Sequence, residues 1–173
     1  MSLDRPRFPK VPLERRAYAF LIDFVTVWLL SSFAGPTFQW LIFLVAWFGL
    51  RVITVEKNHG QSLGDWALDM KVIDVRFKRI PGILELSKRE GIVGFTALLA
   101  MIGLNINFAN ALSMLLLITP LLVDCGLALG DEELNQTFHD RIAGTIVIQT
   151  RRGFSLDLRL KKLISELQQK RRR

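Results

Sequence analysis

Apolar residues dominate long stretches of this chain, and polar residues gather between them. Two such stretches cover residues 17–34 and 38–55, with only three residues between them. A third covers residues 92–129, contains a single charged side chain, Asp124, and has asparagines near its middle, between residues 105 and 110. A helix needs roughly 20 apolar residues to cross about 30 Å of hydrocarbon. The pattern therefore predicts four transmembrane helices as two hairpins, with the last two spans near 91–108 and 110–129.

The same stretches argue against the buried helices of a soluble bundle. Such helices carry polar residues at helical spacing on their outer faces, and these segments show almost none. The predicted fold class is therefore an all-α membrane protein.

The distribution of basic residues agrees with this prediction and indicates how the helices are oriented in the membrane. The chain has a net charge of +7 and a mean hydropathy of +0.30. Lys and Arg number five in residues 1–16, seven in 56–90 and ten in 130–173, whereas the two hairpin loops hold none. The excess of Lys and Arg in cytoplasmic loops then places both termini and the middle loop in the cytoplasm. Asp23 interrupts the first apolar run and a second span follows at once, so a cleaved signal peptide is not expected.

The resulting division of the chain has six parts. They are a basic cytoplasmic N-terminus (1–16), transmembrane hairpin 1 (17–55), a cytoplasmic loop (56–91), transmembrane hairpin 2 (92–129), a cytoplasmic segment containing His-Asp (130–150) and a basic amphipathic tail (151–173).

A short polar pattern follows each hairpin. Gln-Ser-Leu-Gly-Asp at 61–65 matches Gln-Thr-Phe-His-Asp at 136–140 after a shift of 75 residues, and each precedes a β-branched run that contains Val-Ile. The pattern indicates a tandem repeat about an axis along the membrane normal, although two unrelated amphipathic linkers would also fit. We expect residues 71–80 to form a short cytoplasmic strand or hairpin against the run at 145–149, which would tie the two hairpins together.

Charged residues inside the spans are candidates for chemistry. Arg16 and Asp23 lie on one stripe of the first helix, and Asp23 is about 10 Å deeper at 1.5 Å per residue. Asp124 and Arg51 lie at similar depths, so Asp23, Asp124 and Arg51 are expected to meet near the cytoplasmic side. Intramembrane charges often mark ion pathways, but a buried ion pair also holds helices in register. The cluster is either a cation or proton site or a structural ion pair.

His139 and Asp140 directly follow the second hairpin. His139 is the candidate for a proton relay, because histidine titrates near neutral pH. Thr137 and Asp140 also fit a capping box at the start of a short helix that Gly144 would end. The same polar pattern recurs at residues 62–65 without a histidine, which favours the cap.

The tail has apolar residues at helical spacing opposite basic ones. A basic amphipathic helix beside a membrane favours contact with anionic lipids, and docking on a protein partner is the alternative. Nucleic-acid binding is not expected, because no base-reading pattern accompanies the charge. The candidate contact residues are Arg159, Lys161, Lys162, Lys170, Arg171, Arg172 and Arg173.

The sequence motifs give little support for an enzyme active site or for a metal site. Gly60 to Gly64 fits the G-x-S-x-G pattern of a hydrolase nucleophile, but that motif needs a preceding strand, and here a transmembrane helix precedes it. Two histidines and one cysteine are too few for a closed His/Cys zinc site. No metal, cofactor or catalytic residue is therefore predicted.

Four motifs resemble one family of membrane proteins. Arg-Arg-Ala-Tyr-Ala-Phe-Leu-Ile-Asp at 15–23, the Gly-Gln-Ser-Leu-Gly motif, Lys-Arg-Glu at 88–90 and His-Asp-Arg-Ile-Ala-Gly-Thr at 139–145 look like the RDD family of small bacterial membrane proteins. The resemblance covers residues 13 to about 150. The family's signature residues fall in order on Arg16, Asp23 and Asp140. The chain departs at Asp65, where the family usually has lysine, so a basic role at that position is not implied.

The resemblance implies two functions. Some members are regarded as cation/proton antiporters, which would make Asp23 and Asp124 alternating acceptors and Arg51 their internal competitor. Four spans are few for a transporter, so this reading implies a homo-oligomer. Many members have no assigned activity, and the alternative is a non-catalytic accessory or assembly subunit of a larger membrane complex. Either would reside in the bacterial cytoplasmic (inner) membrane or an internal membrane.

Overall fold

A computed structural model describes most of the chain: residues 9, 11–106, 110–130 and 135–150, and residues 155, 156, 158, 159, 162, 165, 166 and 168 of the tail. Its elements in order are α1 (Leu13–Ser32), α2 (Gly35–Phe48), the π-helix η1 (Gly49–Ile53), α3 (Thr54–Lys57), α4 (Leu63–Ala67), β1 (Met70–Asp74), α5 (Ile83–Asn105), α6 (Ala111–Gly126), the 3₁₀-helix η3 (Leu127–Gly130), α7 (Phe138–Ala143) and β2 (Thr145–Gln149).

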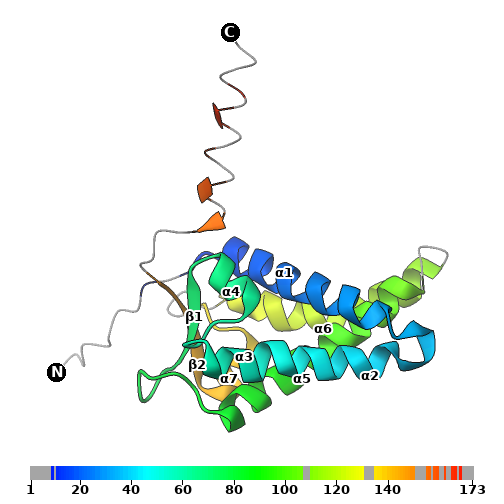
Figure 1. Cartoon of the computed structure of the whole chain (residues 1–173), viewed down its shortest axis with the longest axis horizontal. Coiled ribbons are helices and arrows are strands. Elements are labelled where there is room, and N and C mark those ends of the chain that lie inside the picture. Colours follow the sequence, from blue (N-terminus) through cyan, green and yellow to red (C-terminus); the bar gives the residue numbers. More distant parts are fainter. Residues whose placement is uncertain are drawn as a thin grey trace.

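Two helical hairpins lie side by side and form the body of the molecule (Figure 1). α1 packs against α2, α2 against α5, and α5 against α6. Within the described residues, two helical stretches are long and apolar enough to cross a membrane, Gly35–Lys57 and Ala111–Gly130. These correspond to the second and fourth predicted spans. The first and third long helices, α1 and α5, carry more charged residues than these two stretches.

The helix that contains the third predicted span is longer than that span. We expected the span to start near residue 91, whereas α5 begins at Ile83, so part of the segment predicted as a loop is helix. Hydropathy placed the boundary after Arg89 and Glu90 because both are charged. Both side chains are in fact buried within the bundle, where they have ion-pair partners.

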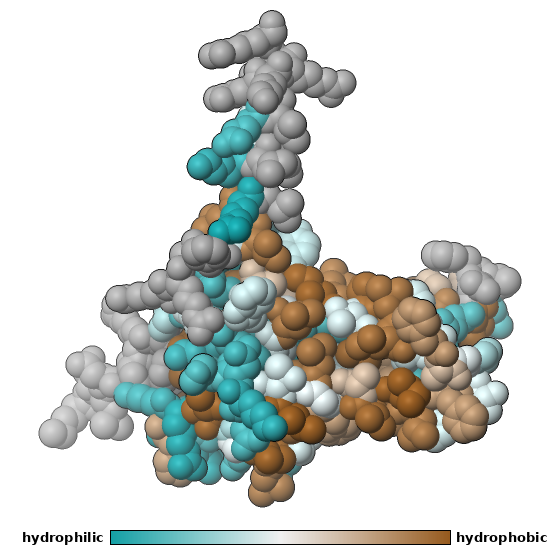
Figure 2. Space-filling model, viewed as in Figure 1, coloured by the Kyte–Doolittle hydropathy of each residue, from teal (hydrophilic) through white to brown (hydrophobic). Residues whose placement is uncertain are grey.

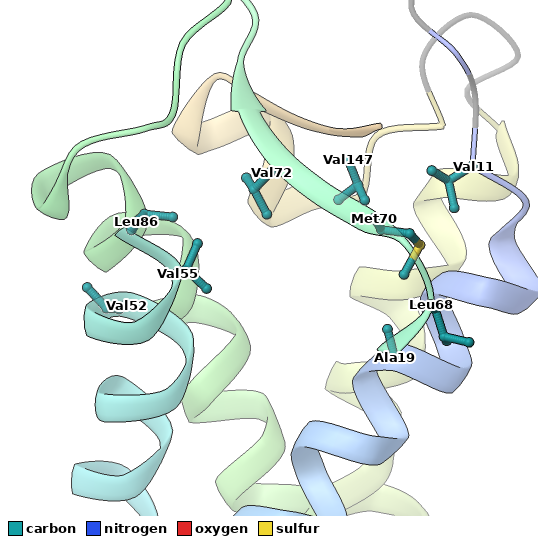
Figure 3. Packing of buried hydrophobic residues seen from close by; sticks show 9 residues of the cluster. All are labelled: Val11, Ala19, Val52, Val55, Leu68, Met70, Val72, Leu86 and Val147. Atoms are coloured by element: carbon teal, nitrogen blue, oxygen red, sulfur yellow. The ribbon is translucent and has the colours of Figure 1, made fainter. Parts of the chain in front are cut away.

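A two-stranded antiparallel sheet covers one end of the bundle, and its pairing agrees with the prediction, although β1 ends at Asp74 and residues 75–80 are not part of the strand. β1 pairs with β2, and Val72 lies opposite Val147. Figure 3 shows Met70, Val72 and Val147 near the helix ends, in one apolar cluster with Ala19 of α1 and others. The sheet thus closes the bundle at the end opposite to the turn between α1 and α2 (Figure 1).

The two units match in structure at the spacing of 75 residues. Gln61 donates its side-chain amide to the carbonyl of Met70, and Gln136 donates to the carbonyl of Thr145. These carbonyls belong to the first residues of β1 and β2, and α4 and α7 begin 75 residues apart. The sequence similarity therefore marks corresponding elements, and the central Val72–Val147 pair relates the two strands by a local two-fold axis.

Polar and apolar surfaces separate along the long axis. Hydrophobic residues cover the helical body, and hydrophilic residues gather at the sheet end (Figure 2). All four long helices expose large apolar side chains, including Leu29, Val45, Phe95 and Leu116. This distribution is typical of a protein whose helices face lipid.

The described residues of the tail are partly consistent with the expected helix. Arg159 and Lys162 have helical backbones and exposed side chains. The other predicted contact residues, Lys161, Lys170 and 171–173, lie outside the described residues.

Candidate functional site: a buried network of ion pairs

Asp23 is fully buried on α1 and has three hydrogen-bond donors. Nη1 of Arg51 donates to Oδ2 at 2.5 Å, and the Ser62 hydroxyl donates to the same oxygen at 2.6 Å. The backbone N–H of Gly64 donates to Oδ1 at 2.7 Å. The expected contact between Asp23 and Arg51 is present, and two more donors come from Gly64 of α4 and from its capping residue Ser62.

Gly64 is required where α4 meets α1. A Cβ atom at this position would overlap the backbone carbonyl of Ala19. The missing side chain lets the N-terminus of α4 approach α1 closely enough for its N–H to reach Asp23.

Arg51 lies in the π-helix η1, within the continuous helical stretch from α2 to α3. It binds two acids at once: Nη1 contacts Asp23, while Nε and Nη2 donate to Glu90 at 2.9 and 3.2 Å. The guanidinium also lies 5.4 Å from the ring centre of Trp47. Single π turns inside α-helices occur frequently at functional sites.

The network continues along α5 to α7. Glu90 accepts from Arg89 at 2.9 Å and from the indole N–H of Trp47 at 3.2 Å. Nε of Arg89 donates to Asp140 at 2.9 Å, and the other Asp140 oxygen accepts from Arg16 of α1. Acids and arginines therefore alternate in the order Asp23, Arg51, Glu90, Arg89, Asp140 and Arg16. Three positive charges balance three negative ones.

Asp140 lies beyond the apolar helices, where its surroundings keep it ionised. Burial alone would raise the pKa of Asp140, but the charges of Arg16 and Arg89 outweigh burial and lower it well below its usual range. The backbone N–H of Thr137 also reaches Asp140 at 3.5 Å, which completes the predicted capping box. Gly144 ends α7 with a φ of 67°, as expected. The cap is only part of the role of Asp140, because its main partners are the arginines.

Asp124 does not join Asp23 and Arg51, which corrects the expected three-residue cluster. Its Oδ1 accepts from the backbone N–H of His139 at 3.1 Å, and its Oδ2 lies 2.5 Å from Nδ1 of the same residue. Nε2 of His139 lies 2.9 Å from the Thr137 hydroxyl. The short helix after each hairpin therefore directs its second N–H at a buried aspartate: α4 at Asp23 and α7 at Asp124.

A cavity of about 470 Å³ lies beside the network, between α1, α5 and α6. Its walls are mainly apolar, and its polar lining includes all three network arginines, Asp65 and His139. Ion pairs and a sizeable cavity thus share one end of the bundle.

Comparison with known proteins decides the family. The model of the RDD family matches residues 10–144, more than three quarters of the chain. The chain belongs to the RDD family. No curated protein and no solved structure matches it.

The RDD signature positions now have physical partners. Arg16 and Asp140 contact each other directly, although they are 124 residues apart. Asp23 lies at the other end of the same network, joined to them through Arg51, Glu90 and Arg89.

Sequence reasoning missed Arg89 and Glu90 as site residues. The available signal was the Lys-Arg-Glu motif at 88–90, which we used only for the family resemblance. Two charged residues directly before a long apolar run can be buried in the bundle when residues of opposite charge are available there as ion-pair partners. Ser62 and Gly64 carry the Asp23 contact within the G-x-S-x-G pattern, where the serine hydroxyl donates to a carboxylate.

Proposed function

We propose that this RDD protein is a non-enzymatic, multi-pass accessory or assembly subunit of a larger membrane complex. It would reside in a bacterial cytoplasmic membrane or an internal membrane. The proposal includes four spans, with α1 and α5 crossing beside α2 and α6 and both termini on the cytoplasmic side.

The four-span arrangement is supported by how the charges of α1 and α5 are placed. Arg16, Asp23, Arg89 and Glu90 all pair within the network rather than facing outward. Both helices expose apolar side chains beyond these charges, such as Leu29 on α1. Charges that are paired inside a bundle are compatible with a surrounding bilayer.

One observation carries the choice of an accessory role. Each carboxylate oxygen of Asp23, Glu90, Asp124 and Asp140 has at least one hydrogen-bond partner within the protein. An alternating-access cation site needs a carboxylate that exchanges its partners during the cycle. The network instead has the features of a structural contact that holds α1, η1, α5 and α7 together. Breaking one of its ion pairs would leave a buried charge without a partner.

Native purification tests this proposal. The full chain with a small tag would be isolated in mild detergent from its own cells, sized, and its stoichiometric partners identified. Recovery in a larger assembly supports the accessory role, and a homo-oligomer without partners contradicts it.

Paired variants separate a structural Asp23 from a transporting one. Asp23→Asn should lower the yield of folded protein, and adding Arg51→Gln should restore part of it by removing the unpaired cation. The exposed Glu56→Gln is the matched control. A folded Asp23→Asn protein that has lost a measurable cation flux would contradict the accessory role.

Ion-coupled transport is the second candidate, and the His139–Asp124 pair supports it. His139 lines the cavity, and its Nδ1 lies 2.5 Å from Oδ2 of Asp124, so an imidazole and a carboxylate meet at the cavity wall. Proteoliposomes with a pH-sensitive dye would test it: cation-dependent proton movement that is lost in Asp124→Asn would favour transport over the accessory role.

The tail supplies a further contact in this proposal. The exposed Arg159 and Lys162 belong to the basic amphipathic segment proposed to bind anionic lipid or a protein partner. Deleting residues 155–173 should weaken recovery of the assembly without unfolding the bundle.

A further inference from the structure

The cavity between α1, α5 and α6 has apolar walls suited to a hydrocarbon chain. Leu13, Phe20 and Leu21 come from α1, Val93 from α5, and Leu121 and Leu122 from α6. Leu21 and Leu122 are more than half exposed, so the cavity reaches the outer apolar surface of the bundle. Its volume of about 470 Å³ lies within the range of small-molecule pockets, about 300–1,000 Å³.

The arginines at the polar end of the cavity are already neutralised. Arg51 directs three nitrogens at Asp23 and Glu90, and Arg89 binds Glu90 and Asp140. The balance of three arginines and three acids leaves no excess positive charge for an anionic ligand.

Asp65 adds a fourth acid to the same end. It lines the cavity and is only 5% exposed. In the part of the chain that the structure describes, its Oδ2 atom has no hydrogen-bond partner. The charge of Asp65 acts on Arg51 and Arg89, but both arginines already bind other acids. A buried carboxylate oxygen without a hydrogen-bond donor is unfavourable unless a cation or donor reaches it. The cavity therefore has apolar walls and an unsatisfied acceptor.

We propose that this cavity binds an amphiphile that carries an ammonium group, with the ammonium on Asp65 and its hydrocarbon chain between α1 and α6. An ammonium group supplies the missing positive charge and donors. A hard metal cation is a poorer fit, because it takes about six oxygen ligands. The described residues contain no group of three or more potential His, Cys, Asp or Glu ligands. This inference does not depend on an accessory role.

Cys125 is a built-in reporter for the test. It is the one cysteine of the sequence, it is exposed, and it lines the cavity. The full chain would be purified in a neutral detergent, and the rate of Cys125 alkylation by a maleimide would be measured while dodecylamine is titrated. Dodecanol and dodecanoate are the neutral and anionic probes with the same chain length, and Cys125→Ser gives the background.

The expected result is protection by dodecylamine at about tenfold lower concentration than by dodecanol, which corresponds to about 1.4 kcal/mol. Asp65→Asn should remove this preference, whereas the exposed acid variant Glu56→Gln should keep it. Leu122→Trp, which fills the cavity, should abolish protection by all three probes, and Leu116→Trp on the same helix is its control, because Leu116 does not line the cavity.

Two results would overturn the proposal: equal protection by amine and alcohol in the unaltered chain, or a preference for amine that survives Asp65→Asn. The Leu122→Trp result keeps the test decisive if Asp65→Asn fails to fold, since amine protection that persists in a filled cavity also overturns it.

Vesicles distinguish a lipid from a free amine as the source of the ammonium group. Protein would be reconstituted in phosphatidylglycerol alone or mixed with phosphatidylethanolamine. Slower alkylation with phosphatidylethanolamine assigns the site to a membrane lipid. Equal rates, together with protection by dodecylamine, assign it to a free long-chain amine.

Discussion

Replacing Glu90 by glutamine removes one charge from the centre of the network while keeping the size of the side chain. Glu90 accepts four hydrogen bonds, two from Arg51 and one each from Arg89 and Trp47. In Glu90→Gln, the Oε1 position still serves Nη2 of Arg51 and Nη1 of Arg89. The new amide nitrogen faces the Nε–H of Arg51 and the indole N–H of Trp47. All three groups are donors, so the two hydrogen bonds at this position are lost.

The expected loss of stability is large. The three arginines would face only two acids, and removing one partner of a buried ion pair costs about 3–5 kcal/mol. Unfolding in dodecyl maltoside micelles with rising SDS, followed by far-UV circular dichroism, measures the difference. Glu56→Gln, an exposed acid, should change the free energy of unfolding by less than about 0.5 kcal/mol.

The double variant Glu90→Gln with Arg51→Gln sharpens the test. If the network is a unit, the two losses should not add, because the second change removes a cation that the first left short of partners. A loss below about 1 kcal/mol for Glu90→Gln alone would refute the view that this network holds the bundle together.

Three further predictions follow from individual contacts. The pKa of Asp140 is lower in the folded protein than in the unfolded chain. Its contribution to stability is therefore complete above the unfolded pKa of about 3.9 and is lost as pH falls through the lower folded value. Between pH 7 and pH 3, the free energy of unfolding should depend less on pH in Asp140→Asn than in the unaltered chain. Gly64→Ala should cost about 2–3 kcal/mol through its clash with α1, whereas Gly91→Ala, where a Cβ has open space, should stabilise by roughly 0.5–1 kcal/mol in the same SDS titration. Lys71→Cys with Ile148→Cys in a Cys125→Ser background should form a disulfide on oxidation, seen as a gel shift, because these residues face each other across the strands; its absence would contradict the register.

Much of the fold follows from local sequence patterns. Hydropathy located the second and fourth helices, because lipid-facing segments need apolar side chains all around. The β-branched runs and their 75-residue spacing predicted the pairing of β1 with β2. Ser62 and Thr137 marked the starts of α4 and α7, because short polar side chains at the first position of a helix satisfy free N–H groups.

The partners within the site were harder to predict. Arg51 and Asp23 could be paired because their depths along two adjacent helices are similar. Asp124 lies at a comparable depth, yet its partner is His139 of α7, whose position beside Asp124 depends on how α7 docks on the bundle. Hydropathy alone treats Glu90 as a boundary, and only the three-dimensional arrangement shows that its charge is compensated. Depth along a helix can be counted from sequence, whereas the direction of a side chain around the bundle requires tertiary packing.

The long separation between Arg16 and Asp140 has a consequence for biosynthesis. Arg16 and Asp23 leave the ribosome first, and Asp140 follows more than one hundred residues later. During this interval the charges of Arg16 and Arg89 have not yet met Asp140. Completion of the ion-pair chain therefore requires that α7 has been made and has docked. A chain cut short before α7 would keep Arg16 and Arg89 without Asp140, and would therefore hold two buried cations that lack an acid partner.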